Sequence, residues 1–276
     1  MSTRAEAATP RALARLYCPP AHAPLLAALL GVEAEIGVTL KSGLEHDVAH
    51  ARLAWWREEC ARLVAGAPTH PLTRALGAQF PEAARGTLAG LGGLVDLAGW
   101  DLAAATFASQ QELSGYCERW SEALIVPFTR AALPGASAGA RAFGAALREL
   151  ELLLALAPDA RAGRVRLPLA GLEAAAIAPQ ELAGTAAGAP LARLITEAHT
   201  RARRALAAAT FTQQEQPALR ALLVWARMSM LFSQRAQAAL PRLAPPGDHQ
   251  RALDGLSAWR IARRAARGRL SVTDPA

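Results

Sequence analysis

A single aspartate and several arginines follow a strongly apolar stretch at 149–169, ELELLLALAPDARAGRVRLPL. Asp159 could contribute to a site for a hard cation such as Mg²⁺, which prefers carboxylate oxygens. A second carboxylate one helical turn earlier would share such a cation, because side chains at i and i+4 lie on one helical face. Ala155 stands there instead. The segment therefore looks like half of a polar site whose other half is missing.

Two further pairs of polar residues have spacings that could matter for chemistry. Asp96 and Asp101 are five residues apart, which places them about 140° apart around a helix and makes them a poor metal-binding pair. Helix-surface or capping roles and pocket lining both remain open for them. His46 and His50 are spaced to share one helical face, but no H-E-x-x-H motif accompanies them, so we expect a surface pair.

The sequence offers no strong signal for a nucleophile or a nucleotide site. Cys18, Cys60 and Cys117 are widely spaced with no C-x-x-C, which argues against disulfides and zinc and suits a reducing cytoplasm. There is no P-loop, G-x-S-x-G or Rossmann fingerprint. The N-terminal residues lack the apolar core of a secretory signal, and no uninterrupted apolar run approaches a membrane span. We therefore expect a soluble or peripheral protein.

The elements that must position these residues are predicted to be helices throughout. Ala and Leu dominate a chain that is 52% hydrophobic, whereas the β-branched and aromatic runs of strands are almost absent. Without a linker or convincing repeat, residues 1–276 are expected to form one all-α domain. The expected helices span about 23–41, 45–65, 71–78, 81–104, 109–133, 138–157, 190–209, 215–240 and 248–267. We expect Pro127 to kink or break its helix, and the helix before Pro158 to end there. Short helical turns are expected after Gly163, one of them opened by Pro179.

Three stretches resemble the squalene/phytoene synthase family, all-α enzymes that join two prenyl diphosphates head to head. The stretch ARLAWWREEC (51–60) with THPLTRAL (69–76) is similar to the family's R-L-x-W-W-R-[DE]-E and H-P-[VL]. We expect Trp55 and Trp56 to pack in the core. Arg52 would be a remnant of the family's substrate or cavity site.

The second stretch, 94–117, is similar to I-D-G-x-x-x-D-L-x-x-x-R-Y-x-T-F-x-x-L-x-x-Y-C. The matching positions are Asp96, Asp101, Leu102, Leu113, Tyr116 and Cys117. The middle of the motif has drifted. The resemblance implies that Asp96, Asp101 and Tyr116 are cavity or substrate-binding remnants, although packing is the expected role of Tyr116 and Cys117.

The first aspartate motif of the family, F-x-R-E-[VI]-D-D-x-x-D, is degenerate in the aligned stretch 29–41, LLGVEAEIGVTLK. Glu35 matches, but Gly37 and Val38 replace the paired aspartates, and Lys41 stands at the third acidic position. An ammonium there would repel Mg²⁺. Glu35 is expected to be a solvated helix charge.

The opening stretch resembles the second aspartate motif, Q-L-T-N-I-L-R-D-x-x-x-D, followed by G-R-x-Y-L-P. Ala155 replaces the first aspartate and only Asp159 survives. Glu151 could serve as a relocated ligand. Arg164 is retained as a substrate-binding remnant, whereas Arg166 replaces the usual tyrosine.

The net charge is +7, and Lys41 is the only lysine. The arginine bias fits either a GC-rich genome or an anionic partner. It is concentrated in a predicted basic C-terminal helix at about 248–268, where Asp248 would be the N-cap. Its arginines are Arg251, Arg260, Arg263, Arg264, Arg267 and Arg269. A solvated helix end, an anionic membrane surface and nucleic acid are the alternatives for this cluster.

The resemblance implies an isoprenoid-synthase helical bundle around a central cavity, and the motif losses imply that Mg²⁺-dependent condensation is gone. Our first hypothesis is a non-catalytic lipid-binding or membrane-associated assembly-type factor, cytoplasmic or peripheral on the inner membrane face. It would need no cofactor and would bind an isoprenoid or other lipid, or a protein. The alternative is a prenyl transferase with residual or relocated Mg²⁺ ligands; a nucleic-acid binder ranks third, and no specific nucleic acid is expected.

Overall fold

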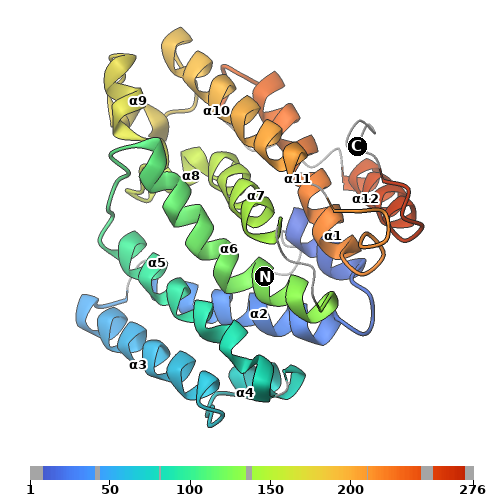
Figure 1. Cartoon of the computed structure of the whole chain (residues 1–276). Coiled ribbons are helices and arrows are strands. Elements are labelled where there is room, and N and C mark those ends of the chain that lie inside the picture. Colours follow the sequence, from blue (N-terminus) through green and yellow to red (C-terminus); the bar gives the residue numbers. More distant parts are fainter. Residues whose placement is uncertain are drawn as a thin grey trace. The chain divides into compact units, whose positions relative to one another are not determined.

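The computed structural model describes residues 9–40, 44–80, 82–134, 139–209, 211–243 and 251–270. Within these residues the regular elements are helices, apart from one isolated β-bridge between Ala186 and Arg242 (Figure 1). The predicted all-α class is confirmed. The chain divides into two compact units, described separately below: unit 1 holds 1–19, 106–114 and 146–276, and unit 2 holds 20–105 and 115–145. The expectation of one domain around a central cavity stays a prediction.

Unit 2 is built from the first half of the chain. Its elements are α2 (Ala23–Gly37), η2 (Val38–Leu40), α3 (His46–Val64), α4 (Pro71–Gln79), η3 (Glu82–Leu91), α5 (Gly92–Leu102) and most of α6 (Gln110–Ala132). Helix α2 packs on α4 and α5, and α3 packs on α5 and η3.

Unit 1 is built mainly from the second half, with the N-terminal helix added to it. Its elements are α1 (Pro10–Leu16), most of α7 (Ala140–Leu154), α8 (Leu156–Arg161), α9 (Leu169–Ala174), η4 (Pro179–Ala183), α10 (Ala189–Ala208), α11 (Arg220–Ala238) and α12 (Arg251–Ala265). Helix α11 lies against α1, α10 and α12.

Helix α2 is the most apolar element of unit 2. The window 23–40 has a mean hydropathy of 1.6 and is, by length and composition alone, able to cross a membrane. A core helix meets the same criterion. In this structure 39% of the window is buried, on the face that carries Leu25, Leu29 and Val32.

The apolar stripe predicted for 45–65 is confirmed in α3. Its members are all buried: Ala49, Leu53, Trp56, Cys60 and Leu63. The prediction that Trp55 also packs in the core is wrong, because its side chain is 39% exposed. Adjacent helical positions differ by about 100° in direction, so Trp55 and Trp56 cannot both point into the same core.

Proline and glycine account for the errors in the predicted boundaries. Helix α6 continues through Pro127, and α8 contains Pro158 in its first turn, where backbone N–H groups lack helical partners and a missing one costs little. The helix expected at 81–104 begins instead as the 3₁₀ segment η3. Gly90 there lies so close to α6 that a Cβ would be 2.5 Å from the carbonyl oxygen of Glu122.

Helix α1 was not predicted from the sequence. Its start nevertheless carries a recognisable signal, because the Thr9 side chain accepts a hydrogen bond from the Ala12 N–H and Pro10 occupies the first turn. The other helices agree with expectation to within a few residues, including the turn opened by Pro179. The predicted N-cap, Asp248, lies outside the described residues.

Candidate functional site

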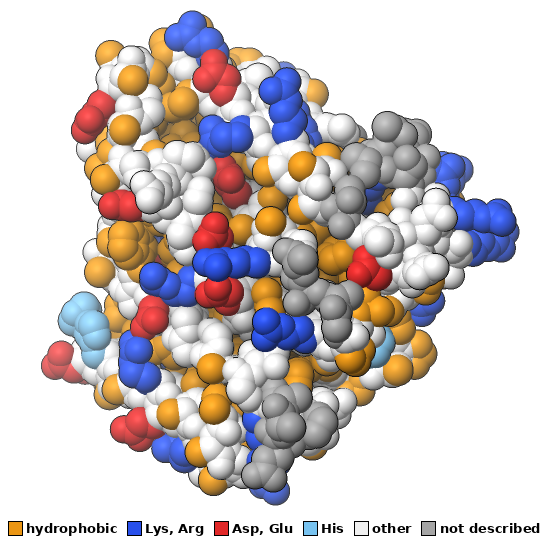
Figure 2. Space-filling view, viewed as in Figure 1, with side chains coloured by type: hydrophobic (Ala, Val, Ile, Leu, Met, Phe, Trp, Pro, Cys, Tyr) orange, Lys and Arg blue, Asp and Glu red, His pale blue; other side chains and the backbone are white. Residues whose placement is uncertain are grey.

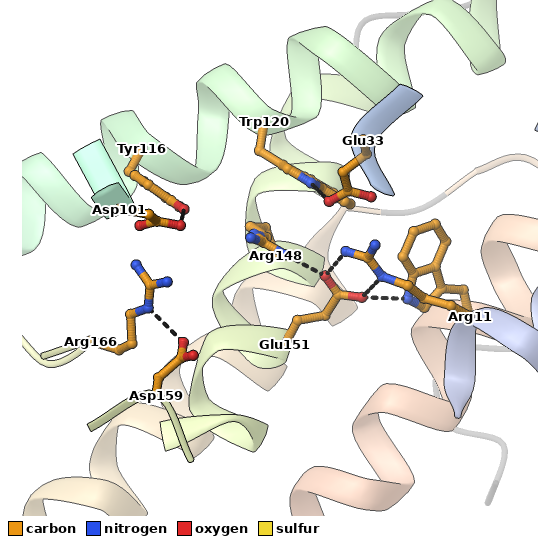
Figure 3. Close-up of polar contacts among 10 residues, drawn as sticks. Arg11, Glu33, Asp101, Tyr116, Trp120, Arg148, Glu151, Asp159 and Arg166 are labelled. Carbon is orange, nitrogen blue, oxygen red and sulfur yellow. Dashed lines mark hydrogen bonds and ion pairs between the residues drawn. The ribbon is translucent and has the colours of Figure 1, made fainter. Parts of the chain in front are cut away.

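The end of α2, where the first aspartate motif would lie, holds two glutamates that point to different partners. Glu33 accepts a 2.7 Å hydrogen bond from the indole N–H of Trp120 on α6 (Figure 3). Glu35 pairs with Arg52 of α3 at 3.2 Å, and both side chains are partly exposed. Glu35 is therefore partly solvated, as expected, but it also forms an ion pair, which was not expected. These carboxylates form no cluster.

The motif positions themselves lie where the helix ends. Helix α2 stops at Gly37, and Val38 begins the 3₁₀ turn η2. The Thr39 hydroxyl is buried and donates to the Ile36 carbonyl at 2.7 Å. Lys41 lies outside the described residues. The segment thus offers neither carboxylates nor a continuing α-helix at the paired-aspartate positions.

Asp96 and Asp101 point apart, as their spacing predicts. Asp96 is exposed and pairs with Arg57 at 2.8 Å. Asp101 is buried and accepts a 3.0 Å hydrogen bond from the Tyr116 hydroxyl. Tyr116 and its neighbour Cys117 are both buried, so the expected packing role is confirmed for them. The structure thereby unites Asp101 with Tyr116 and separates both from Asp96.

Removing the Tyr116 hydroxyl is expected to destabilise unit 2. Tyr116→Phe deletes a buried donor to Asp101, which should lower the free energy of unfolding by about 1.5 kcal/mol. Urea denaturation measures this loss. Tyr17→Phe removes the chain's other phenol from a partly buried position and is the control. Equal losses in the two variants would contradict a specific role for the Tyr116 hydroxyl.

In the second-motif segment, which lies in unit 1, the arginines pair with the surviving aspartate. Asp159 accepts a 2.9 Å hydrogen bond from Arg164. It accepts a second one, of 2.7 Å, from Arg166 (Figure 3). The Arg166 side chain is only 5% exposed. Gly163, with φ of 81°, takes the left-handed conformation that lets the chain turn back after α8. The surviving aspartate is therefore held by arginines of its own segment.

The helical register before Asp159 is also interrupted. Ala155, which occupies the position of the first aspartate, lies in the break between α7 and α8 with φ −96° and ψ 8°. Its carbonyl still accepts the Asp159 N–H at 2.9 Å, so one turn separates the two residues. Asp159 consequently has a methyl group where a second metal ligand would be required.

Glu151, the candidate relocated ligand, is the centre of an ion cluster in unit 1 (Figure 3). It accepts two 2.6 Å hydrogen bonds from Arg11 of α1, one of 3.1 Å from Arg148 and one of 3.0 Å from the indole of Trp225. Burial raises the pKa of Glu151, but the charges of Arg11 and Arg148 outweigh it and leave the pKa below its usual range. Arg11 also lies over the Trp225 ring.

The most extensively bonded carboxylate of unit 2, Glu59, was not singled out from the sequence. It is fully buried and binds the backbone N–H groups of Thr69 and His70, each at 2.8 Å, the hydroxyls of Thr69 and Thr73, and Arg62. The signal was its register, three residues after Trp56 on the buried face of α3. Glu59 ends the WWREE run, so this motif joins α3 to the THP turn that begins α4.

The histidine pair behaves as a surface feature. His46 and His50 lie in the first turns of α3, are exposed, and have their Nε2 atoms 2.9 Å apart. Among the described residues, no three His, Cys, Asp or Glu side chains are grouped so that they could hold a metal ion.

The Mg²⁺ implied by the resemblance can be tested against each segment separately. Such a site requires several carboxylate oxygens and bound waters in octahedral geometry. The α2 segment supplies two divergent glutamates, each already hydrogen-bonded. The Asp159 segment supplies one carboxylate that two guanidinium groups already neutralise. The donors of neither segment fit a magnesium cluster.

The chain is similar to known proteins both in sequence and in fold. The squalene/phytoene synthase family model matches residues 5–246. A crystal structure of a dehydrosqualene synthase with a bound ligand superposes with a TM-score of 0.71, at 16% identity, over 92% of this chain and 90% of that chain. The squalene synthase HpnC from Alicyclobacillus acidocaldarius superposes with a TM-score of 0.61, at 20% identity, over 82% and 87%. No curated protein sequence matches the chain.

The two solved structures confirm the expected isoprenoid-synthase fold. The motif remnants from Arg52 to Arg164 lie within the residues that the family model matches. This chain belongs to the squalene/phytoene synthase family.

Proposed function

We propose that this chain is a non-catalytic member of its family that acts as a lipid-binding or membrane-associated assembly-type factor. We expect it in the cytoplasm or on the inner face of the membrane. The observation that carries the proposal is the capture of Asp159 by Arg164 and Arg166, with Ala155 one turn away.

The chemical argument rests on what head-to-head condensation requires. Ionising an allylic diphosphate expels pyrophosphate, and Mg²⁺ stabilises the negative charge that develops on it. A carboxylate that already neutralises two guanidinium groups is a weak ligand, and the adjacent positive charges repel the metal. The Gly37 and Val38 substitutions remove the other half of the donor set. These substitutions support loss of the ionisation step.

The alternative is a prenyl transferase with relocated ligands, the kind of activity that the names of the solved dehydrosqualene and squalene synthases state for those proteins. Glu151 was the candidate ligand for it. Its oxygens are already occupied by Arg11, Arg148 and Trp225, so its recruitment to a metal would require dismantling a buried cluster. This cost favours the non-catalytic proposal.

The test is turnover. Purified full-length protein should give no apolar product from farnesyl or geranylgeranyl diphosphate with Mg²⁺, with or without a nicotinamide reductant. The Alicyclobacillus squalene synthase HpnC, assayed in parallel on its own substrate, provides the reference. Clear Mg²⁺-dependent product formation or pyrophosphate release would overturn the proposal in favour of the prenyl transferase.

A further inference from the structure

The inner face of α12 is fixed against the rest of unit 1. Ala258, Ile261 and Ala262 are buried in a cluster with Leu13 of α1 and Val224 of α11. Asp254, near the start of α12, is buried and pairs with Arg235 of α11. These contacts determine which side of the helix faces outward.

The outward face of α12 carries exposed apolar side chains that the fold does not use. Leu253 is 61% exposed, Leu256 42% and Trp259 45%. Their spacing of three residues places them within about 120° of one another around the helix. Three large apolar groups on one outward face form an exposed apolar patch, and such patches are typical of surfaces that bind a protein or a membrane.

Arginines occupy the same side at the C-terminal end of the helix. Trp259 and the arginines line a shallow concavity of about 560 Å³, whose lining residues are Trp259, Arg260, Arg263, Arg264, Arg267 and Arg269. The guanidinium carbon of Arg263 lies over the indole of Trp259, 5.3 Å from the ring centroid. Figure 2 shows Lys and Arg side chains projecting at the right of the view, where Figure 1 draws α12.

The one acidic residue of α12 does not neutralise this concavity, because Asp254 is buried and engaged by Arg235 on the other side of the helix. Among the residues that the structure describes, the lining contains no carboxylate. The outward face is therefore apolar in its first turns and strongly cationic in its last turns.

We propose that this face of α12 docks on an anionic phospholipid surface, with Leu253, Leu256 and Trp259 entering the headgroup region and the arginines binding lipid phosphates. Anionic lipids attract basic side chains near the surface, and indole rings favour the membrane interface. The proposal deepens the membrane-associated part of the proposed function, but it holds whether or not the chain is catalytic.

A nucleic acid could bind the arginines through its phosphates, but it would leave the leucines exposed to water. Phosphate contacts supply non-specific nucleic-acid affinity, and a duplex offers no apolar phase for Leu253 and Leu256. A lipid interface accepts both kinds of side chain, so the combination favours lipid.

The experiment is vesicle flotation with the full-length protein. Vesicles of phosphatidylcholine mixed with phosphatidylglycerol should bind the protein, whereas vesicles of phosphatidylcholine alone should bind it far more weakly. Arg260→Gln with Arg263→Gln should weaken binding about 30-fold, since each basic residue near the surface contributes on the order of 1 kcal/mol. Leu253→Ser with Leu256→Ser should weaken it roughly tenfold.

Arg193→Gln with Arg204→Gln is the matched control, because it removes two exposed arginines from α10 and changes the net charge equally. It should bind like the wild type. Circular dichroism and the thermal midpoint report whether each variant is folded. Equal binding to neutral vesicles, or equal losses in the α10 and α12 arginine variants, would overturn the proposal. So would tight duplex DNA binding that depends on the α12 arginines while the leucine variant binds vesicles normally.

Discussion

Glu59→Gln should lower the free energy of unfolding by about 3 kcal/mol, because it removes a charge that a buried network is built to stabilise. The carboxylate is 0% exposed and joins α3 to the Thr69–Thr73 segment. An amide of the same shape can accept through only one atom. Its NH₂ group would face either the backbone donors or Arg62. Denaturation at neutral pH measures the loss.

A neighbouring residue supplies the control for this variant. Glu58 also pairs with Arg62, but at 3.4 Å and with a side chain that is 71% exposed. Glu58→Gln should therefore change stability by no more than about 0.5 kcal/mol. Comparable losses in the two variants would show that the buried network contributes no more than a surface ion pair.

The same carboxylate predicts a pH dependence. Burial raises its pKa, but the hydrogen bonds from Thr69, Thr73, His70 and Arg62 outweigh burial and lower the pKa from 4.5 to about 2. A group with a lowered folded-state pKa contributes stability above its unfolded pKa and loses it as the pH falls. The stability difference between wild type and Glu59→Gln should therefore shrink from pH 4.5 towards pH 2. A difference that stays constant across this range would contradict the assignment.

Local pattern predicts much of the architecture. The stripe from Ala49 to Leu63 repeats at helical spacing and is buried, and a proline in the first turn begins both α4 and η4. Pro158 does not end the helical segment but lies in the first turn of α8, where a proline removes only a donor that has no helical partner. The close approach of Gly90 in η3 to α6 is a tertiary contact, which a sequence pattern does not reveal.

In the candidate site, too, the sequence predicts the local features but not the tertiary contacts. The sequence predicts that Asp159 lost its partner at Ala155, since both positions lie in one turn. That Arg166 supplies the replacement charge follows from the turn at Gly163, which only the structure shows. Partners distant in sequence are harder still to predict. Glu33 meets Trp120, 87 residues away, because tertiary packing brings two helices together.

The ion cluster of unit 1 is the second place where one substitution should have a large effect. Glu151→Ala leaves Arg11 and Arg148 facing each other without the carboxylate between them, which should cost about 4 kcal/mol. Because Arg11 connects α1 to a residue 140 positions away, amide exchange in α1 should also accelerate. Glu173→Ala, at an exposed position of α9, is the control and should leave both measurements nearly unchanged.

A second substitution distinguishes an unbalanced charge from a simple loss of volume. In the double variant Glu151→Leu with Arg11→Met, the carboxylate and one facing guanidinium are replaced together by apolar side chains. Such replacements are far less costly than removing one partner, so the double variant should be more stable than Glu151→Leu alone by about 2 kcal/mol. If the losses of Glu151→Leu and of Arg11→Met alone simply add up in the double variant, the two side chains are not coupled, and α1 is held mainly by the packing of Leu13 on α11.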